Sequence, residues 1–159
     1  MKYPIGIQSF ERIIEDGYVY VDKTHLIYDL THSGSIYFLS RPRRFGKSLL
    51  VSTLENYYLG RKELFKGLAM EKLEKEWNVH PVFHVDFNGA NFTKEGVLET
   101  MLEDYVNKWE KQYGLHTNRE LETGLRFRDV LKSAHEQTGH RAVVLIDEYD
   151  KPILDVLGL

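Results

Sequence analysis

The chain has 159 residues, of which 42% are hydrophobic and 28% are charged, and its formal net charge is −3. This composition is typical of one soluble globular domain, and the negative charge argues against a protein that mainly coats nucleic acid. The absence of cysteine excludes disulfides, thiolate metal sites and cysteine nucleophiles, while the lack of any apolar run of roughly 18 residues excludes a membrane span.

The first half of the chain is expected to form short helices around one apolar strand. The expected elements are, in chain order, a short β-prone run at 18–21, a helix over 23–31, an apolar strand at 36–39, a helix over 47–59 and two short helical pieces within 61–77. Asp22 is expected to cap the first helix and Gly34 to end it, because a short acceptor side chain before the first turn and a glycine after the last are typical helix boundaries. For the same reason Gly60 is expected to end the second helix.

The second half alternates apolar strands with amphipathic helices. The expected elements are a strand at 82–87 behind Pro81, a helix over 93–112, a helix over 119–137 between Asn118 and Gly139, and a strand at 142–146. The inward face of the first of these helices is expected to contain Val97, Met101, Leu102, Tyr105, Val106 and Trp109. This alternation predicts an α/β fold with a parallel sheet flanked by helices. Because three core strands are few for an open parallel sheet, we expect the chain to be the front part of a longer protein.

The stretch SRPRRFGKSLL at 40–50 predicts a phosphate-binding loop. It lies between an expected strand and an expected helix, and in that context backbone N–H groups at the helix start surround a phosphate. Gly46 brings the backbone close to the phosphate because it has no Cβ atom, and the Lys47 ammonium reaches the phosphate oxygens. The Ser48 hydroxyl takes a coordination position on Mg²⁺. These three residues match the end of the Walker A pattern G-x-x-x-x-G-K-[ST].

The first half of this loop departs from that pattern. Arg41 stands where the pattern has glycine, and Pro42 removes one N–H donor. Arg43 and Arg44 add positive charge that either attracts a triphosphate or faces a protein or nucleic-acid partner, and the sequence leaves both open. A lone Gly-Lys-Ser also fits an exposed helix start, so the tripeptide needs a second motif to support it.

The second motif is AVVLIDE at 142–148, an apolar strand followed by two acidic residues as in Walker B. Asp147, at the carboxyl end of the strand, is suited to hold the water shell of Mg²⁺, and Glu148 to polarise a water for attack on the γ-phosphate. Taken alone, this acidic pair also fits a solvated loop after a buried strand. Ligands of parallel sheets bind at the carboxyl ends of strands, where both motifs lie, so the two together favour a nucleotide site.

Other residues give weaker signals. Asp86 ends the strand at 82–87 and is either a further site carboxylate or, more commonly at such a position, a residue that caps a loop. A metal site without nucleotide would use Asp147, Glu148, Asp150 and Asp155, but no partner motif accompanies them. Trp77 and Trp109 are expected in the core rather than on a base-stacking platform.

On these residues the chain resembles the AAA-ATPase-like proteins of bacteria and archaea, in which a P-loop ATPase domain precedes a C-terminal nuclease-like domain of the PD-(D/E)XK superfamily. The stretches that carry the resemblance are PIGIQSFERIIEDGYVYVDKTHLIYDL (4–30), YFLSRPRRFGKSLLVSTLENYYLGRKELFKGL (37–68), PVFHVDFNGANF (81–92) and VVLIDEYDKPI (143–153). They span nearly the whole chain. The resemblance implies that SRPRRFGKS is the family's own form of the Walker A loop, so that Arg41 is a family trait.

The resemblance also implies which residues form the site, with ATP and Mg²⁺ as its cofactors. The residues expected to contact the nucleotide are Arg43, Arg44, Phe45, Gly46, Lys47, Ser48 and Leu49. We expect Ser48 and Asp147 to be the metal ligands and Lys47 and Glu148 to be the catalytic residues.

The same resemblance divides the chain into a family-specific N-terminal segment, 1–35, and a nucleotide-binding core, 36–159. It implies a P-loop fold with an extra strand between the Walker A and Walker B strands. That strand, its sensor residue, any arginine finger and the nuclease-like domain are all expected after residue 159, so hydrolysis is assigned to the intact protein.

Three functions follow as hypotheses. The first is an ATP-binding, Mg²⁺-dependent NTPase domain, and the second is a nucleotide switch without turnover that acts on a nuclease-like partner domain. The third is a nucleic-acid-binding domain that uses Arg41, Arg43 and Arg44 as a basic patch, against which the acidic overall charge counts. The charged N-terminal segment lacks the apolar run of a secretory signal, and with the lack of cysteine this predicts a cytoplasmic location.

Overall fold

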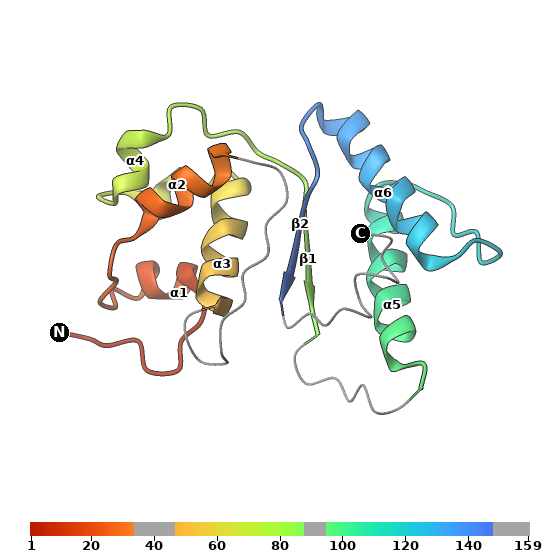
Figure 1. The fold of residues 1–159 in the computed structure, drawn as a ribbon, viewed down its shortest axis with the longest axis horizontal. Coiled ribbons are helices and arrows are strands. Elements are labelled where there is room, and N and C mark those ends of the chain that lie inside the picture. The colour runs from red at the N-terminus through yellow and green to blue at the C-terminus, as the bar shows by residue number, and fades with distance from the viewer. Residues whose placement is uncertain (34–46, 88–94, 148–159) are drawn as a thin grey trace. The chain divides into compact units, whose positions relative to one another are not determined.

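The computed structural model describes residues 1–33, 47–87 and 95–147 (Figure 1). These residues belong to two compact units, Met1–His80 and Pro81–Leu159, called here the N-terminal unit and the C-terminal unit. Each unit has a hydrophobic core of its own. The strand expected at 36–39 and the helix end expected at Gly34 lie outside the described residues.

The N-terminal unit consists of short helices. Its elements are α1 (Phe10–Glu15), α2 (Thr24–Ser33), α3 (Lys47–Tyr58), the 3-10 helix η1 (Lys62–Phe65) and α4 (Ala69–Leu73). The helix expected over 47–59 and the two helical pieces expected within 61–77 are confirmed. The helix expected over 23–31 is confirmed as α2, which extends two residues further.

A side chain and a glycine set two of these helix boundaries. Asp22 accepts a hydrogen bond from the Thr24 N–H at 2.9 Å at the start of α2, as a capping residue does. After α3 the chain turns at Gly60, which has a φ of 71° and donates its N–H to the Tyr57 carbonyl. A Cβ atom at Gly60 would lie 2.9 Å from the Val79 side chain, so both the backbone and the space require glycine.

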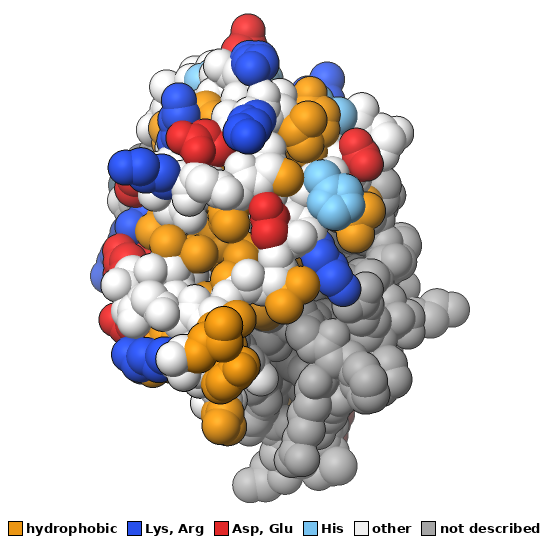
Figure 2. Space-filling model, turned by 90° about the vertical axis from the view of Figure 1, so that its left-hand side faces the viewer, with side chains coloured by type: hydrophobic (Ala, Val, Ile, Leu, Met, Phe, Trp, Pro, Cys, Tyr) orange, Lys and Arg blue, Asp and Glu red, His pale blue; other side chains and the backbone are white. Residues whose placement is uncertain are grey.

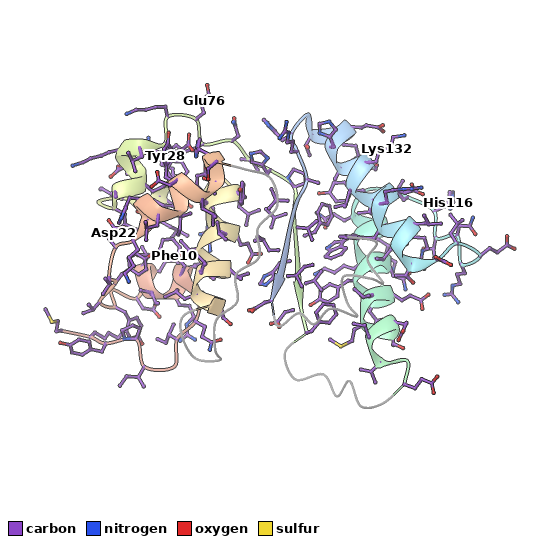
Figure 3. All side chains as sticks on the ribbon, viewed as in Figure 1. Phe10, Asp22, Tyr28, Glu76, His116 and Lys132 are labelled. Carbon is purple, nitrogen blue, oxygen red and sulfur yellow. The ribbon has the colours of Figure 1, made fainter. Side chains whose placement is uncertain are left out.

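Aromatic rings fill the core of the N-terminal unit. The ring centroid of Phe10 (labelled in Figure 3) lies 4.8 Å from that of Phe65 and 5.4 Å from that of Tyr20. The buried residues of this core are Phe10, Ile27, Leu64, Phe65 and Met70. Leu50, Leu54 and other residues of α3 pack against them, so the apolar side of α3 covers the core as its spacing predicts.

The β-prone run at 18–21 does not form a strand, because these residues are irregular in the structure. The Val19 N–H donates to the Lys2 carbonyl at 2.8 Å and the Tyr18 N–H to the Ile13 carbonyl at 2.9 Å, two isolated bonds rather than a ladder. High β-propensity means that a side chain fits a half-buried surface. Tyr20 finds such a surface without a strand, because its ring packs on Phe10.

Figure 2 shows a face of the N-terminal unit on which hydrophobic side chains are mixed with acidic and basic ones. Among the described residues of this unit, the hydrophobic side chains that are more than half exposed are Met1, Tyr3, Ile5, Val21, Leu26 and Val79. On the described part of this face the charges of both signs are interspersed, so it does not carry the single-sign field typical of a nucleic-acid surface. The arginines at 41, 43 and 44 lie outside the described residues.

The C-terminal unit pairs two strands with two long helices. Its elements are β1 (Val82–Asp86), α5 (Val97–Gln112), α6 (Thr123–Thr138) and β2 (Val143–Asp147). The strands are parallel, with a register that runs from Val82 opposite Val143 to Asp86 opposite Asp147. Both strands expected here are confirmed, and so is the α/β class with a parallel sheet and helices beside it (Figure 1). None of the described helices is long and apolar enough to cross a membrane.

Alternation along the strands sets the face that the helices cover. Phe83, Val85 and Phe87 are buried in one cluster with residues of α5 and α6, and Val144 and Ile146 of β2 pack against that cluster. Because successive side chains of a strand point to opposite faces, Asp86 and Asp147 lie on the other face of the two-stranded sheet. The side chains expected on the inner face of α5 include Leu102, Val106 and Trp109, which are buried.

Both long helices begin later than the sequence predicts. α5 begins at Val97 because Gly96 before it has a φ of 80°, outside the helical region. The Asn118 side chain accepts a hydrogen bond from the Glu120 N–H as expected, but the bond closes a local turn and α6 begins at Thr123. The end of α6 at Gly139 is confirmed, because this residue has a φ of 71° and donates its N–H to the His135 carbonyl.

A buried ion pair joins α5 to α6. The Arg126 guanidinium donates from Nε at 2.9 Å and from Nη2 to the Glu110 carboxylate, and only 3% of either side chain is exposed. Arg126 also donates to the side chains of Asn107 and Glu103. The guanidinium therefore has partners on several turns of α5, as a buried charge requires.

Candidate functional site

The first candidate segment is the N-terminal turn of α3. This helix begins at Lys47, directly after the glycine of the Gly-Lys-Ser tripeptide, so Ser48 and Leu49 lie in its first turn. The first four N–H groups of any α-helix have no acceptor within the helix, and the helix dipole makes that end attractive to anions. The start of α3 therefore agrees with the helix start that the sequence predicts after the phosphate-binding loop.

The rest of α3 is anchored in the N-terminal unit. The Phe10 N–H at the start of α1 donates to the Ser52 hydroxyl at 3.0 Å, which ties α1 to α3 one turn beyond Ser48. The Leu49 side chain packs against the hydrophobic core, so a nucleotide contact by this residue would use its main chain. The first turn of α3 is thus held from one side by the core.

The second candidate segment is the carboxyl end of the two-stranded sheet. Asp147 ends β2 and is 5% exposed, and Asp86 lies opposite it at the end of β1. The Phe87 N–H donates to the Asp147 carbonyl at 3.4 Å, which extends the pairing one residue beyond β1. Two carboxylates are therefore neighbours on the same face at the edge where ligands of parallel sheets bind.

A tyrosine of α5 holds the end of β1, a feature that the sequence interpretation did not include. The Tyr105 hydroxyl accepts a hydrogen bond from the Asp86 N–H at 3.2 Å and donates one to the Asp86 carbonyl at 3.3 Å. The helical spacing predicts Tyr105 on the inner face of its helix but gives no role for its hydroxyl. The signal for that role is chemical, because a tyrosine packed at a core needs a polar partner for its O–H.

The side chains at this edge fit Mg²⁺ in their chemistry. Mg²⁺ takes oxygen ligands and is usually bound by one or two carboxylates while it keeps several waters. Asp86 and Asp147 supply such carboxylates on neighbouring strands. Among the described residues no group of three or more histidines and acidic residues is close enough to hold a metal by itself.

Several of the expected site residues lie outside the described part of the chain. These are Arg43, Arg44, Phe45 and Gly46 of the loop and Glu148 of the second motif, together with the side chain of Lys47. Of the described ones, Ser48 and Leu49 belong to the N-terminal unit and Asp147 to the C-terminal unit. Of the two motifs, the described residues include Lys47 and Ser48, in the first turn of α3, and the apolar run through Asp147, which forms β2.

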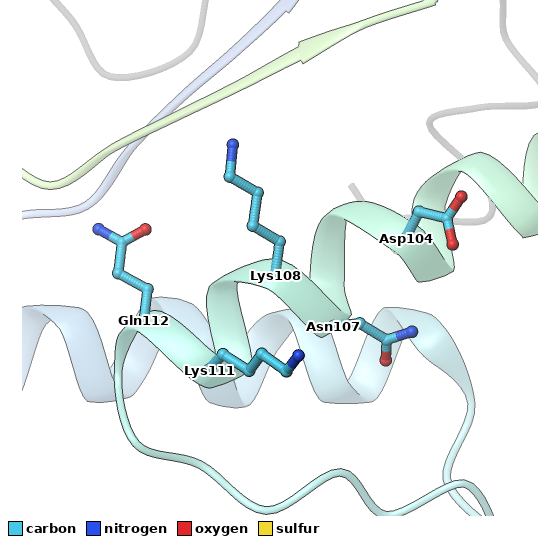
Figure 4. Close-up of a pocket in the computed structure, with 5 residues that line it drawn as sticks. All are labelled: Asp104, Asn107, Lys108, Lys111 and Gln112. Carbon is cyan, nitrogen blue, oxygen red and sulfur yellow. The ribbon is translucent and has the colours of Figure 1, made fainter.

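A hollow of about 620 Å³ lies elsewhere, along α5 (Figure 4). The side chains that line it are Asp104, Asn107, Lys108, Lys111 and Gln112. All of them come from one helix and are polar or charged, which is typical of the solvated face of an amphipathic helix. Neither motif contributes to this hollow, so it does not form the candidate site.

Comparison with known proteins gives a family match over nearly the whole chain. A family model described as "Predicted AAA-ATPase", of the AAA-ATPase-like family, matches residues 4–158. The chain is also 43% identical over 157 residues to a protein of Azotobacter chroococcum that is named "Uncharacterized protein in vnfD 5'region". That alignment covers 98% of this chain and 30% of the relative, so the chain spans less than a third of the relative's length. No solved structure matches significantly.

Proposed function

The chain belongs to the AAA-ATPase-like family, and on this premise we propose that it is an ATP-binding P-loop domain that supports Mg²⁺-dependent ATP hydrolysis in the intact protein. The observation that carries the proposal is the start of α3 at Lys47, immediately after Gly46. A phosphate site of this kind needs a glycine followed by a helix whose free N–H groups face the anion.

The loop residues bind the phosphates in this proposal. Gly46 allows close approach of the backbone, Lys47 contributes a point charge at the β- and γ-phosphates, and Ser48 directs its hydroxyl to the metal. Arg43, Arg44, Phe45 and Leu49 contribute main-chain contacts or positive charge around the same phosphates. Arg41 in place of the first glycine belongs to the family's form of the loop.

The acidic residues after β2 provide the second half of the site. Asp147 holds the metal side of the nucleotide, and Glu148 orients and polarises the attacking water. When bound, Mg²⁺ neutralises charge on the phosphate oxygens. What supports these roles is the position of Asp147, which is buried at the carboxyl end of a parallel strand.

The experiment that tests the proposal is the removal of the loop lysine. Lys47→Ala should abolish ATP binding in titration calorimetry, because it removes the point charge that this proposal places at the β- and γ-phosphates. Lys23→Ala is a matched control, since this exposed lysine directly precedes the first residue of α2 and so also lies at a helix start. An unchanged ATP affinity in Lys47→Ala contradicts the proposal.

A nucleotide switch without turnover is the second candidate function. The length of the relative supports this candidate, because it leaves room for a further domain. The matched chain covers 30% of that protein, so the nucleotide site in a whole protein of this kind would act together with a further domain, for which we propose the nuclease-like type. Glu148→Gln separates the two candidates, with Asp150→Asn as a control that removes the next carboxylate. Phosphate release that is lost only in Glu148→Gln supports turnover, and release that is unaffected in both removes the catalytic role of Glu148.

A direct nucleic-acid role for the arginines at 41, 43 and 44 is the third candidate. A DNA mobility shift that disappears in the triple alanine variant and weakens steeply with salt would support it. No shift at low salt would exclude it. A cytoplasmic location stays a prediction from the sequence.

A further inference from the structure

We infer that Tyr105 is a positioning residue for the acidic edge of the sheet, and that its hydroxyl fixes the Asp86–Asp147 pair in the arrangement that a divalent cation requires. The inference rests on the proposed function, because it concerns the metal side of the same nucleotide site. Tyr105 touches neither metal nor nucleotide in this account and acts only through the end of β1.

The hydroxyl of Tyr105 makes both of its hydrogen bonds with one residue. It accepts from the Asp86 N–H at 3.2 Å and donates to the Asp86 carbonyl at 3.3 Å. In a parallel ladder these groups would otherwise be available to a further strand. The tyrosine therefore takes the place of a neighbouring strand at this one residue.

The ring of Tyr105 is itself held by the core of the C-terminal unit. It stacks on Trp109, one turn further along α5, with ring centroids 5.3 Å apart and an angle of 27° between the planes. Trp109 is 6% exposed and in turn packs edge-on against Phe83 of β1 at 5.1 Å. The position of the hydroxyl is thus determined by rigid packing, and not by a mobile surface side chain.

The end of β1 passes this constraint on to Asp147. Asp86 is the register partner of Asp147, and the next residue, Phe87, donates its N–H to the Asp147 carbonyl at 3.4 Å. Phe87 is 1% exposed and belongs to the same core cluster as Trp109. A shift of Asp86 therefore displaces Phe87 and, with it, the hydrogen bond that Phe87 donates to the main chain of Asp147.

Such a constraint matters because the two aspartates are register partners at the ends of neighbouring strands, so the main chain sets where both side chains start. Mg²⁺ demands near-ideal octahedral geometry, so its affinity is sensitive to the placement of the carboxylates that approach it. Removal of a group that hydrogen-bonds to a metal ligand and orients it typically lowers metal affinity by about 10–100-fold.

The test is Tyr105→Phe in the full chain, which keeps the ring and removes only the hydroxyl. Tyr113→Phe is the matched control, because it removes the same atom from another tyrosine of this core, whose ring lies 5.8 Å from Phe83. Two quantities are measured in each protein: amide hydrogen exchange at residues 86 and 87, and the affinity of Mn²⁺ for the complex with ADP by paramagnetic resonance. ADP affinity in EDTA serves as the readout of the phosphate loop alone.

We expect Tyr105→Phe to speed amide exchange at residues 86 and 87 and to weaken Mn²⁺ binding about 3–10-fold. This effect is smaller than for a group that hydrogen-bonds directly to a metal-ligating side chain, because Tyr105 acts through the main chain of Asp86. ADP affinity in EDTA should stay at the wild-type value, and Tyr113→Phe should change none of the three. Faster exchange with unchanged Mn²⁺ affinity would overturn the inference, because Tyr105 would then be merely structural. A wild-type chain that binds neither ADP nor Mn²⁺ would overturn the proposed function, and the inference with it.

Discussion

The two units of the chain stabilise their helices in different ways. The N-terminal unit has helices of 5 to 12 residues, whereas α5 and α6 of the C-terminal unit have 16 residues each. Helices shorter than about 12–15 residues are marginal in water by themselves. The short helices therefore depend on specific polar contacts at their ends, while the long ones present continuous apolar stripes to a sheet.

Several polar contacts of the N-terminal unit gather at the junction of α2 and α4. Asp22 accepts hydrogen bonds from Thr24 and, through its other oxygen, from the Ala69 N–H at 2.7 Å. The Thr24 hydroxyl accepts from the Met70 N–H at 2.9 Å. Asp22, just before α2, and Thr24, its first residue, thus also cap the start of α4. The exposed Asp22 is labelled near this junction in Figure 3.

In the C-terminal unit the main polar contact is inside the helix pair. Arg126 and Glu110 lie at positions that belong to the buried stripes of α6 and α5, next to Phe127 and Trp109. A buried ion pair of this kind is costly to break but adds little over a well-packed apolar pair. We therefore expect single changes in the C-terminal unit to lower the free energy of unfolding strongly, and changes at the junction of α2 and α4 to lower it moderately.

The largest effect is expected from Arg126→Met. This change leaves the Glu110 carboxylate buried without its charged partner, which should lower the free energy of unfolding by about 3–5 kcal/mol. Urea denaturation followed by circular dichroism measures the loss. Arg128→Met is the control, because Arg128 is exposed on the same helix.

The double variant Arg126→Met with Glu110→Leu sharpens this result. It replaces both charges by apolar side chains, so we expect it to recover most of the stability lost in the single variant. If the double variant is no more stable than Arg126→Met, the cost arises from packing and not from the uncompensated carboxylate.

Much of the fold follows from local patterns in the sequence. Gly60 and Gly139 mark helix ends, and the apolar runs at β1 and β2 are too short and too rich in valine for helices. The failures are of two kinds. The run at 18–21 has strand propensity but is irregular, and the Asn118 side chain forms a turn where a cap is expected, because both outcomes depend on contacts that propensity does not include.

The site is predictable in its motifs but not in its supporting contacts. The start of α3 at Lys47 and the end of β2 at Asp147 follow from the spacing of the two motifs. The bond from Tyr105 to Asp86 joins residues 19 apart on different elements, and nothing periodic in the sequence marks it. The same holds for Arg126, although a charged residue inside an apolar helical stripe is a signal for a buried partner.

A moderate effect is expected from Thr24→Val at the junction of α2 and α4. Thr24 is fully buried, and valine keeps its shape but removes the oxygen that accepts from the Met70 N–H. An unsatisfied buried N–H costs about 1–3 kcal/mol, so the urea midpoint should fall accordingly. Thr24→Ser retains the hydroxyl and should lose less; equal losses in both variants would assign the effect to packing.

The smallest effect is expected from the charge of Asp22. Burial alone would raise the pKa of Asp22, but the hydrogen bonds from Thr24 and from the Ala69 N–H outweigh it and lower the pKa below the ordinary value of 3.8. Because the folded pKa lies below the unfolded one, this stabilisation is complete above that ordinary value and is lost as the pH falls through the folded pKa. Asp22 is exposed to solvent, so the contribution should stay below about 1 kcal/mol. In urea titrations the difference between wild type and Asp22→Asn should therefore be largest near neutral pH and shrink in acid. A difference that does not change with pH would mean that the junction uses the shape of Asp22 and not its charge, and the N-terminal unit would then depend on capping geometry alone.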